Sequence, residues 1–327
     1  MFEEWGLLGN VLVLLVSLVI LDRASELTIN NAVKVSELSG FGKTTIGFIL
    51  IALVTTLPEL SVSVFAAVLG KGIDIAVGNV LGSNIVNICL ILGAGFFIAS
   101  MKSTDRLKMV PLLAEEEVGT LYFGLFIASI VPLTLLYIGY ASRFIGIILI
   151  GIFAFYIFRL AKIKHTKNEG CLGKERSKLK RYTFLAVLGA IIVVASANLI
   201  VDSATYIAKL IGVPQVILGA TIVAFGTSLP EFANTLKSAI KGHLELALGN
   251  IVGSCFTNIT LILGVSLIGS TIREDITPFT NPILFSLITN LLLWYFLSSG
   301  KVSWRESAML LFLYLVFIVV SFGGYRT

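Results

Sequence analysis

Charged residues are scarce in this chain: Asp, Glu, Lys and Arg together make up only 13% of its 327 residues. Hydrophobic residues make up 57%, and the mean hydropathy is +0.98. A water-soluble globular domain needs more polar surface than this composition can supply. The sequence therefore predicts a polytopic membrane protein, with room for loops between its spans but none for a separate soluble domain.

Cysteine and histidine are also rare, with three and two copies. Three cysteines, at positions 89, 171 and 255, provide no disulfide framework. The H-E-x-x-H, C-x-x-C and G-x-x-x-x-G-K-[ST] patterns are absent from the sequence. The chain thus offers no recognisable zinc-protease, thiol-redox or ATP-binding motif, and we predict that it is not an enzyme and carries no cofactor.

Long apolar runs dominate what is present. Ten of them approach or exceed the roughly 20 residues that cross a bilayer as a helix. They lie at 6–28, 43–69, 74–99, 118–138, 142–161, 182–208, 214–240, 245–270, 279–298 and 303–323. The fold class that this predicts is all-α, with ten transmembrane helices.

The basic residues are distributed unevenly between the two sides that ten spans would define. One side receives 19 of the 24 Lys and Arg residues, and the other receives 5. The positive-inside rule places the richer side in the cytoplasm and both termini outside the cell membrane. The basic segment 161–181 contributes most, and we interpret it as a cytoplasmic linker beside anionic lipid. The net charge of +5 therefore indicates a lipid bilayer partner and no nucleic acid.

Two stretches of the chain are versions of one segment. Residues 47–59 match 219–231, and residues 78–87 match 249–258. The matches include Pro, Glu and Asn, which a chance resemblance between apolar segments would not reproduce. Each half holds five spans, so the second half enters the membrane from the opposite side. The sequence predicts two inverted five-helix repeats, 1–160 and 182–327, with a site at their interface and broken helices at the core.

Each repeat carries one glutamate directly after a proline, Glu59 after Pro58 and Glu231 after Pro230. A carboxylate at membrane depth is costly and is retained mainly where it handles ions or protons. Proline cannot donate a backbone hydrogen bond, so each helix should be interrupted there. The carbonyl groups freed by the interruption, near Ala52–Thr55 and Ala224–Thr227, are expected to line a cavity and bind a cation.

Further polar side chains recur at a spacing of four residues, which places two side chains on one face of a helix. The pairs are Thr55 and Glu59, Thr227 and Glu231, Ser83 and Asn87, and Ser254 and Asn258. Together they supply only oxygen ligands, which hard cations prefer. Ca²⁺, with six to eight oxygen ligands, fits this set better than Mg²⁺. One copy of the chain suffices to build such a site.

These motifs resemble those of the cation/Ca²⁺ exchanger superfamily, and within it the prokaryotic relatives of the sodium/calcium exchangers. The residues that carry the resemblance are TTLPEL at 55–60, GNVLGSNIVN at 78–87, GTSLPEF at 226–232 and GNIVGSCFTN at 249–258. The resemblance implies a secondary antiporter that moves Ca²⁺ in exchange for H⁺ or Na⁺. By position, it implies a cation site built from Ala52, Thr55, Thr56, Glu59, Ser83, Asn87, Ala224, Thr227, Ser228, Glu231, Ser254 and Asn258.

One of these residues departs from the family pattern. Asn258 stands where many sodium-coupled members carry an aspartate, so the site motifs contain only two carboxylates. Two glutamates balance one Ca²⁺ or two protons, whereas three Na⁺ would be less well compensated. The number of carboxylates favours H⁺ as the counter-ion. The similarity of the motif residues to those of sodium/calcium exchangers favours Na⁺.

Three acidic residues outside the motifs are candidates for the ion pathway. Asp22 and Glu26 lie in the first span, and Asp202 lies in the sixth. In the family, the corresponding spans slide across the core and open its cavities. The alternative is that these residues face water at span ends, or that Asp22 pairs with Arg23.

Two other classes of protein also place acidic residues in a membrane. A cation channel usually has symmetric rings or a continuous filter, and the inverted repeat with one buried pair argues against it. An intramembrane enzyme would need a nucleophile with its base, or a set of metal ligands, and the sequence contains neither.

Overall fold

The structure is a computed structural model of the whole chain. It describes residues 5–38, 56–68, 72–102, 107–108, 115–162, 176–240, 244–270, 277–299 and 301–323. Among the site residues predicted from the sequence, Ala52 and Thr55 lie outside this set.

Helices form nearly all of the described fold, as the long apolar runs predict. The elements of the first half are α1 (Gly6–Leu38), α3 (Leu57–Val68), α4 (Ile73–Ile85), η2 (Val86–Leu92), α5 (Gly93–Lys102), β1 (Leu107–Lys108), α6 (Glu115–Ile138) and α7 (Arg143–Lys162). Those of the second half are α8 (Arg176–Ile211), α9 (Gln215–Leu218), η4 (Gly219–Val223), α10 (Ala224–Thr227), α11 (Leu229–Ile240), α12 (Leu244–Thr257), η5 (Asn258–Ile262), α13 (Leu263–Gly269), η6 (Thr277–Phe279), α14 (Thr280–Ser299), β2 (Lys301–Val302) and α15 (Trp304–Gly323). The two-residue strands β1 and β2 pair in antiparallel register, Leu107 with Val302.

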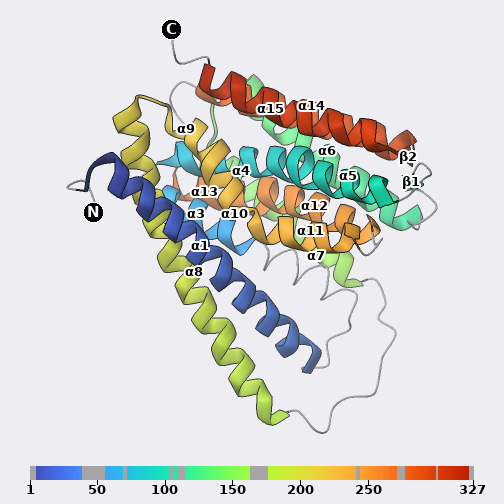
Figure 1. Cartoon of the computed structure of the whole chain (residues 1–327), viewed down its shortest axis with the longest axis horizontal. Helices are drawn as coiled ribbons and strands as arrows, with labels where there is room; N and C mark the ends of the chain where they lie inside the picture. The colour runs from blue at the N-terminus through green and yellow to red at the C-terminus, as the bar shows by residue number, and fades with distance from the viewer. Residues whose placement is uncertain are drawn as a thin grey trace.

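Two long helices pair with each other along one side of the core. In Figure 1, α1 and α8 run side by side along a diagonal, while the other helices are stacked together. Gly189 on α8 lies close to Thr28 and to the carbonyl oxygen of Ala24 on α1, so these two helices touch at backbone distance. The first and sixth predicted spans therefore form a pair of their own against the core.

Six helices of the described chain are long and apolar enough to cross a membrane. They lie at Gly6–Thr28, Ile73–Met101, Leu121–Ile138, Ala247–Gly269, Thr277–Ser299 and Trp304–Gly323. A seventh span is possible by the same criteria if the bent pair Gln215–Thr227 and Leu229–Ile240 counts as one. The predicted stretch 43–69 lies partly outside the described residues, and 142–161 contributes the shorter apolar helix Arg143–Phe158. The count of ten and the inverted repeat stay predictions.

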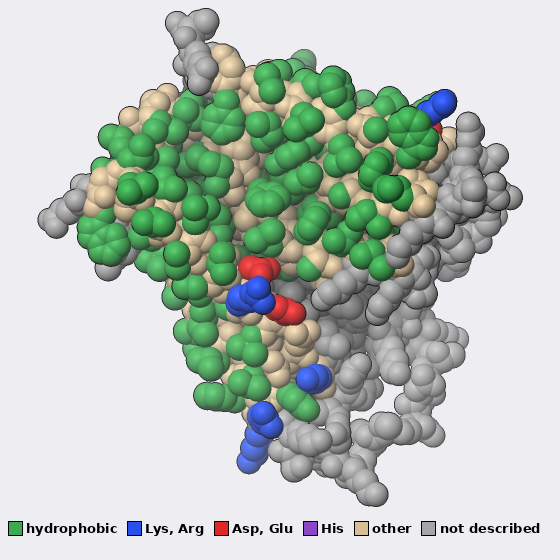
Figure 2. Space-filling view, in the orientation of Figure 1, with side chains coloured by type: hydrophobic (Ala, Val, Ile, Leu, Met, Phe, Trp, Pro, Cys, Tyr) green, Lys and Arg blue, Asp and Glu red, His purple; other side chains and the backbone are tan. Residues whose placement is uncertain are grey.

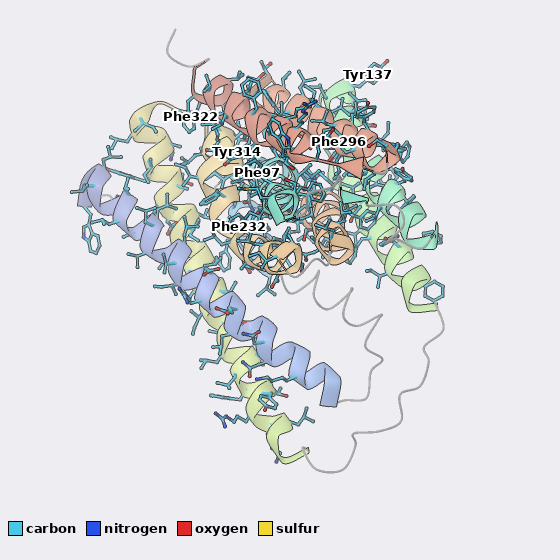
Figure 3. All side chains as sticks on the ribbon, turned by 45° about the vertical axis from the view of Figure 1, so that its right-hand side comes forward. Phe97, Tyr137, Phe232, Phe296, Tyr314 and Phe322 are labelled. Atoms are coloured by element: carbon cyan, nitrogen blue, oxygen red, sulfur yellow. The ribbon has the colours of Figure 1, made fainter. Side chains whose placement is uncertain are left out.

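Apolar side chains cover most of the outer face in Figure 2, as expected of a surface that meets lipid. Examples with large exposed fractions are Phe144, Phe312 and Val319. In Figure 3, Tyr137 lies at the periphery, whereas Phe97 and Tyr314 lie among the stacked helices. Several polar side chains, among them those of Glu59, Asn87 and Asn258, are buried inside.

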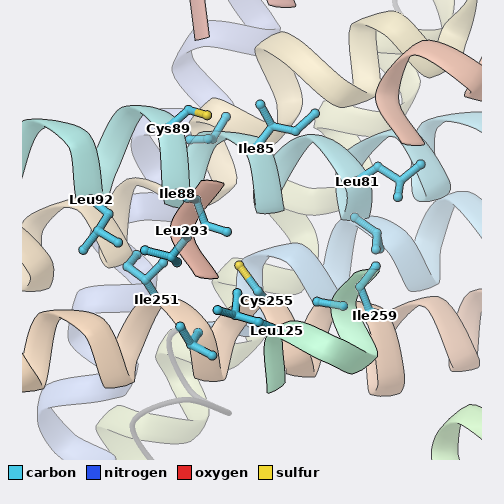
Figure 4. Packing of buried hydrophobic residues seen from close by; sticks show 14 of the residues in the cluster. Leu81, Ile85, Ile88, Cys89, Leu92, Leu125, Ile251, Cys255, Ile259 and Leu293 are labelled. Carbon is cyan, nitrogen blue, oxygen red and sulfur yellow. The ribbon is translucent and has the colours of Figure 1, made fainter. Parts of the chain in front are cut away.

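The central core lies where the equivalent helices of the two halves meet. Figure 4 shows Ile85, Ile88 and Leu92, from α4 and η2, close to Ile251 and Ile259, from α12 and η5. Cys89 and Cys255 are buried in the same cluster as free thiols. The repeated polar residues of α4 and α12, Ser83 and Ser254, are buried beside this packing.

Candidate functional site

The helix that carries Glu231 is broken. Gln215–Thr227 and Leu229–Ile240 meet at an angle of 47°, with Ser228 at the break. Pro230 has no N–H to donate to the carbonyl group of Gly226, four residues earlier, so the helical ladder cannot continue through this point. The predicted interruption is confirmed in the second half. In the first half, α3 begins at Leu57, just before Pro58 and Glu59.

The carbonyl oxygen of Ala224 keeps a backbone partner. It accepts a hydrogen bond from the Ser228 N–H at 3.1 Å, and the Thr227 hydroxyl lies 3.2 Å from it. A carbonyl oxygen has two lone pairs, and the single proton of Thr227 is shared with Asn79 Oδ1, 3.1 Å away. Ala224 can therefore still offer a lone pair to a cation, and the carbonyl group that Pro230 deprives of its helical donor is that of Gly226.

Three π-helical segments surround the same region. They are η2 (Val86–Leu92), η4 (Gly219–Val223) and η5 (Asn258–Ile262). Asn87 lies in η2, and Asn258 is the first residue of η5, so the two halves use the same device at equivalent places. Such segments are rare and often occur at functional sites, because the extra residue re-aims the side chains that follow. The sequence contained no pattern that predicted these π-helical segments.

Helix α4 of the first half packs against the broken helix of the second half at backbone distance. A Cβ atom on Gly82 would overlap the backbone of Ala220, and one on Gly78 would overlap the backbone of Val216. In return, a Cβ on Gly219 would lie 2.6 Å from the carbonyl oxygen of Ile75. Small residues therefore let the two segments approach each other at backbone distance.

The two glutamates are completely buried, each with an exposed fraction of 0%. The Ser228 hydroxyl donates to Oε1 of Glu59 at 3.0 Å, and the Ser254 hydroxyl lies 3.5 Å from Oε1 of Glu231. The charges of Glu59 and Glu231 lie within electrostatic reach of each other. The structure thus brings one carboxyl group from each half to the same interior region.

Thr227 and Glu231 lie on either side of the break at Ser228. The Thr227 hydroxyl donates to Oδ1 of Asn79 at 3.1 Å. The same hydroxyl also interacts with the carboxyl group of Glu59. Polar contacts therefore cross between the two halves.

Asn79 is a site residue that our sequence reasoning missed. It is fully buried, and its Nδ2 donates to the carbonyl oxygen of Glu59 at 3.4 Å and to Ser63 Oγ at 3.2 Å. The signal was available, because the Gly-Asn pair at 78–79 recurs at 249–250.

Several buried oxygen atoms have no hydrogen-bond partner among the described residues. Those in the repeated motifs include Glu59 Oε2, Ser83 Oγ, Asn87 Oδ1 and Asn258 Oδ1. The amide nitrogen of Asn258 is engaged, because it donates to Asn84 Oδ1 at 3.1 Å. Leaving buried polar groups unpaired is costly, so such a set is expected to receive a ligand. Unpaired carboxylate, hydroxyl and amide oxygens are what a hard cation such as Ca²⁺ requires.

The other predicted residues are placed as follows. Thr56 is buried at the start of α3, and its carbonyl oxygen accepts from the N–H of Leu60 at 2.9 Å. Asp22 and Glu26 lie on α1, and Asp202 lies half-buried on α8, so all three belong to the outer helix pair. Asp22 is 3.9 Å from Arg23, which matches the alternative of an Asp–Arg pair.

Comparisons with known proteins agree with this architecture. The family model described as "Sodium/calcium exchanger protein" matches residues 9–162 and 181–323. The sodium/calcium exchanger MaX1 of Methanosarcina acetivorans is 31% identical over 96% of this chain and 98% of its own length. The Ca²⁺/H⁺ antiporter ChaA of Bacillus subtilis is 28% identical over 84% of this chain and 82% of its own.

A solved structure of the sodium-calcium exchanger NCX_Mj, soaked with 10 mM Na⁺ and no Ca²⁺, has a TM-score of 0.66 to this chain at 25% identity. The match covers 96% of this chain and 99% of that one. The relatives are membrane exchangers and antiporters, not enzymes. One of them is named for exchange of Ca²⁺ with Na⁺, and another for exchange of Ca²⁺ with H⁺.

Proposed function

We propose, from the premise that this chain belongs to the sodium/calcium exchanger family, that it is a secondary antiporter which moves Ca²⁺ across the membrane against a monovalent cation. The observation that carries the proposal is the pair Glu59 and Glu231, one from each half and both fully buried. A buried carboxylate needs a positive partner. One shared site would open to the two sides of the membrane in turn. The transport of the two cations is then coupled, because only one kind of cation can occupy the carboxylates at a time.

We assign the Ca²⁺ ligands by chemistry. The carboxyl groups of Glu59 and Glu231 would supply the charge, and neutral oxygens would complete the shell. The neutral candidates are the side chains of Thr227, Ser228, Ser83, Ser254, Asn87 and Asn258, with Thr55, Thr56 and Ala52 as the counterparts in the first repeat. Ala224 would contribute its carbonyl oxygen, which accepts a backbone hydrogen bond from the Ser228 N–H and has a second lone pair.

The proposed topology supports this function. Ten spans would form two inverted repeats, 1–160 and 182–327, joined by the cytoplasmic linker 161–181, with both termini outside. In this scheme α1 and α8 are equivalent helices, and their side-by-side pairing along the stacked helices in Figure 1 fits a pair that moves relative to them. Asp22, Glu26 and Asp202 would then line the path that the pair opens.

Two counter-ions remain candidates, each with its own supporting observation. Protons are favoured by the charge count, because Asn258 is neutral and hydrogen-bonded to Asn84, which leaves two carboxylates to balance one Ca²⁺ or two H⁺. Sodium is favoured by the full-length similarity to MaX1, which is named a sodium/calcium exchanger. We place H⁺ first.

The test is Ca²⁺ uptake by proteoliposomes that contain the purified protein, driven in turn by a pH gradient and by a Na⁺ gradient. Uptake driven by the pH gradient alone is the expected result, and uptake driven by Na⁺ alone would establish the second candidate. Uptake with neither gradient, down the Ca²⁺ gradient only, would indicate a channel and contradict the proposal.

The substitution Asn258→Asp should shift the balance between the two counter-ions. It adds a third carboxylate, and Asn84 can rotate its amide to donate the Nδ2 that has no partner among the described residues. More negative charge among the ligands strengthens Ca²⁺ binding, so we expect the KM for Ca²⁺ to fall roughly tenfold and Na⁺-driven uptake to increase.

The same uptake assay measures both quantities. Asn281→Asp, at the first turn of α14, is the matched control, because it adds the same charge outside the site. Equal responses of the two variants would show that the effect comes from net charge and not from the site.

A further inference from the structure

We infer that Asn79 is a positioning residue, which turns the hydroxyl proton of Thr227 away from the cation so that Thr227 offers its oxygen lone pairs as a ligand. This inference rests on the proposed function and extends it to a residue that binds no cation itself. The Gly-Asn pair that recurs in both halves then belongs to the transport site.

The orientation of the Asn79 amide is determined by its neighbours. Its Nδ2 faces the main-chain carbonyl oxygen of Glu59 at 3.4 Å and Ser63 Oγ at 3.2 Å. A carbonyl oxygen can only accept a hydrogen bond, so the amide nitrogen must lie on this side. Oδ1 therefore faces the other way, toward Thr227, and it too can only accept.

The proton of the Thr227 hydroxyl has a defined direction as a result. Its oxygen lies 3.1 Å from Asn79 Oδ1 and 3.2 Å from the carbonyl oxygen of Ala224. Both neighbours are acceptors, and a hydroxyl has one proton and two lone pairs. The proton points between these two acceptors, and the lone pairs point elsewhere.

A third acceptor, the carboxyl group of Glu59, also interacts with this hydroxyl. A cation that binds the carboxylate occupies the oxygens of that group, and the Thr227 proton is then left with Asn79 and Ala224. A proton directed at the cation would oppose binding, because it carries partial positive charge. Asn79 thus keeps Thr227 competent as a ligand while the cation is bound.

The contact also joins the two halves. Asn79 belongs to α4 of the first half and holds the backbone of Glu59 on α3, while Thr227 belongs to α10 of the second half. Asn250 occupies the equivalent position of the second half and donates to Thr235 Oγ1 at 3.3 Å, as Asn79 does to Ser63. The motif therefore builds the same local support twice.

The test is a double-mutant cycle on Ca²⁺ uptake by proteoliposomes, with Asn79→Ala, Thr227→Val and the double variant. Outer partners that orient a metal ligand typically change affinity by about 10–100-fold when they are removed. We expect each single variant to raise the KM for Ca²⁺ by about that factor with little change in kcat. The double variant should be no worse than the more affected single variant, because both substitutions remove the same interaction.

Ser63→Ala is the matched control, since it removes another hydrogen-bond partner of Asn79 and leaves Thr227 untouched. Its KM should stay within about twofold of the wild type, because Asn79 keeps its contact with the Glu59 carbonyl group. Thr227→Ser keeps the hydroxyl and should restore most of the affinity lost in Thr227→Val. If Asn79→Ala cannot be purified, Asn79→Ser is too short to bridge the same partners and should raise the KM in the same way.

Two outcomes would overturn the inference: an unchanged KM in the Asn79 variant, or effects of the two single substitutions that simply multiply in the double variant. Failure of the proposed function looks different. In that case the wild-type protein itself would show no gradient-driven Ca²⁺ uptake, whatever stands at position 79.

Discussion

Replacement of either buried carboxylate by its amide, Glu59→Gln or Glu231→Gln, is expected to abolish Ca²⁺ transport. Both side chains are fully buried, and glutamine keeps the shape of the side chain while it removes the charge. Two unit charges 4 Å apart attract each other by about 4 kcal/mol at an effective dielectric constant of about 20, and Ca²⁺ carries twice that charge. The loss of one carboxylate should therefore lower affinity by at least about 10³-fold.

Transport is measured as gradient-driven Ca²⁺ uptake, and folding as the melting temperature of the purified protein in detergent. The melting temperature should equal or exceed that of the wild type, because each substitution removes one member of a pair of repelling carboxylates in a buried site. Glu306→Gln is the matched control: Glu306 caps the start of α15 through the N–H of Ser303, and its loss should leave transport intact. Normal uptake by a folded Glu59→Gln or Glu231→Gln protein would remove the basis of the proposed function.

The second large effect is expected from one methyl group at the contact between the two halves. In Gly82→Ala the new Cβ would overlap the backbone of Ala220 in η4, and a backbone cannot move aside as a flexible side chain can. Overpacking of a tight interior typically costs about 1–3 kcal/mol, and a clash with backbone should reach or exceed the upper end. We expect a lower melting temperature and the loss of most Ca²⁺ uptake, because α4 carries Ser83 directly beside this contact.

Gly151→Ala provides the matched control for this prediction. Gly151 lies inside α7, and a Cβ there would meet no atom within 4 Å. Alanine is favoured over glycine in a helix by about 1 kcal/mol, so this variant should be as stable as the wild type or more so. If Gly82→Ala melted and transported like Gly151→Ala, the close approach of α4 to η4 would be contradicted.

Part of the site could be predicted from the sequence, and part could not. Glu59, Glu231 and the interruption near Pro230 could be predicted, because a buried charge and a missing N–H act through local chemistry alone. The position of Thr227 relative to Glu231 could not. A spacing of four places two side chains on one face only in a continuous helix, and here the helix bends by 47° between them.

Partners across the two halves were also beyond the sequence. Ser228 donates to Glu59, and Thr227 donates to Asn79, over separations of 169 and 148 residues. No spacing rule reaches that far, since such contacts depend on how two helices pack. The π-helical segments at Asn87 and Asn258 were missed for a related reason: they change the direction of side chains through one extra residue per turn, and no residue type demands them.

The sequence by itself determined that this protein is a helical membrane protein with a duplicated acidic segment, because hydropathy and the cost of buried charge are properties of the residues. It also determined the family, since the duplicated motifs carry that resemblance. Only the tertiary structure decided which oxygens meet. The glycines of α4 let its backbone touch η4, and that approach places Asn79 between Glu59 and Thr227. Distances across such an interface depend on every side chain packed along it, and for that reason the residues alone could not specify them.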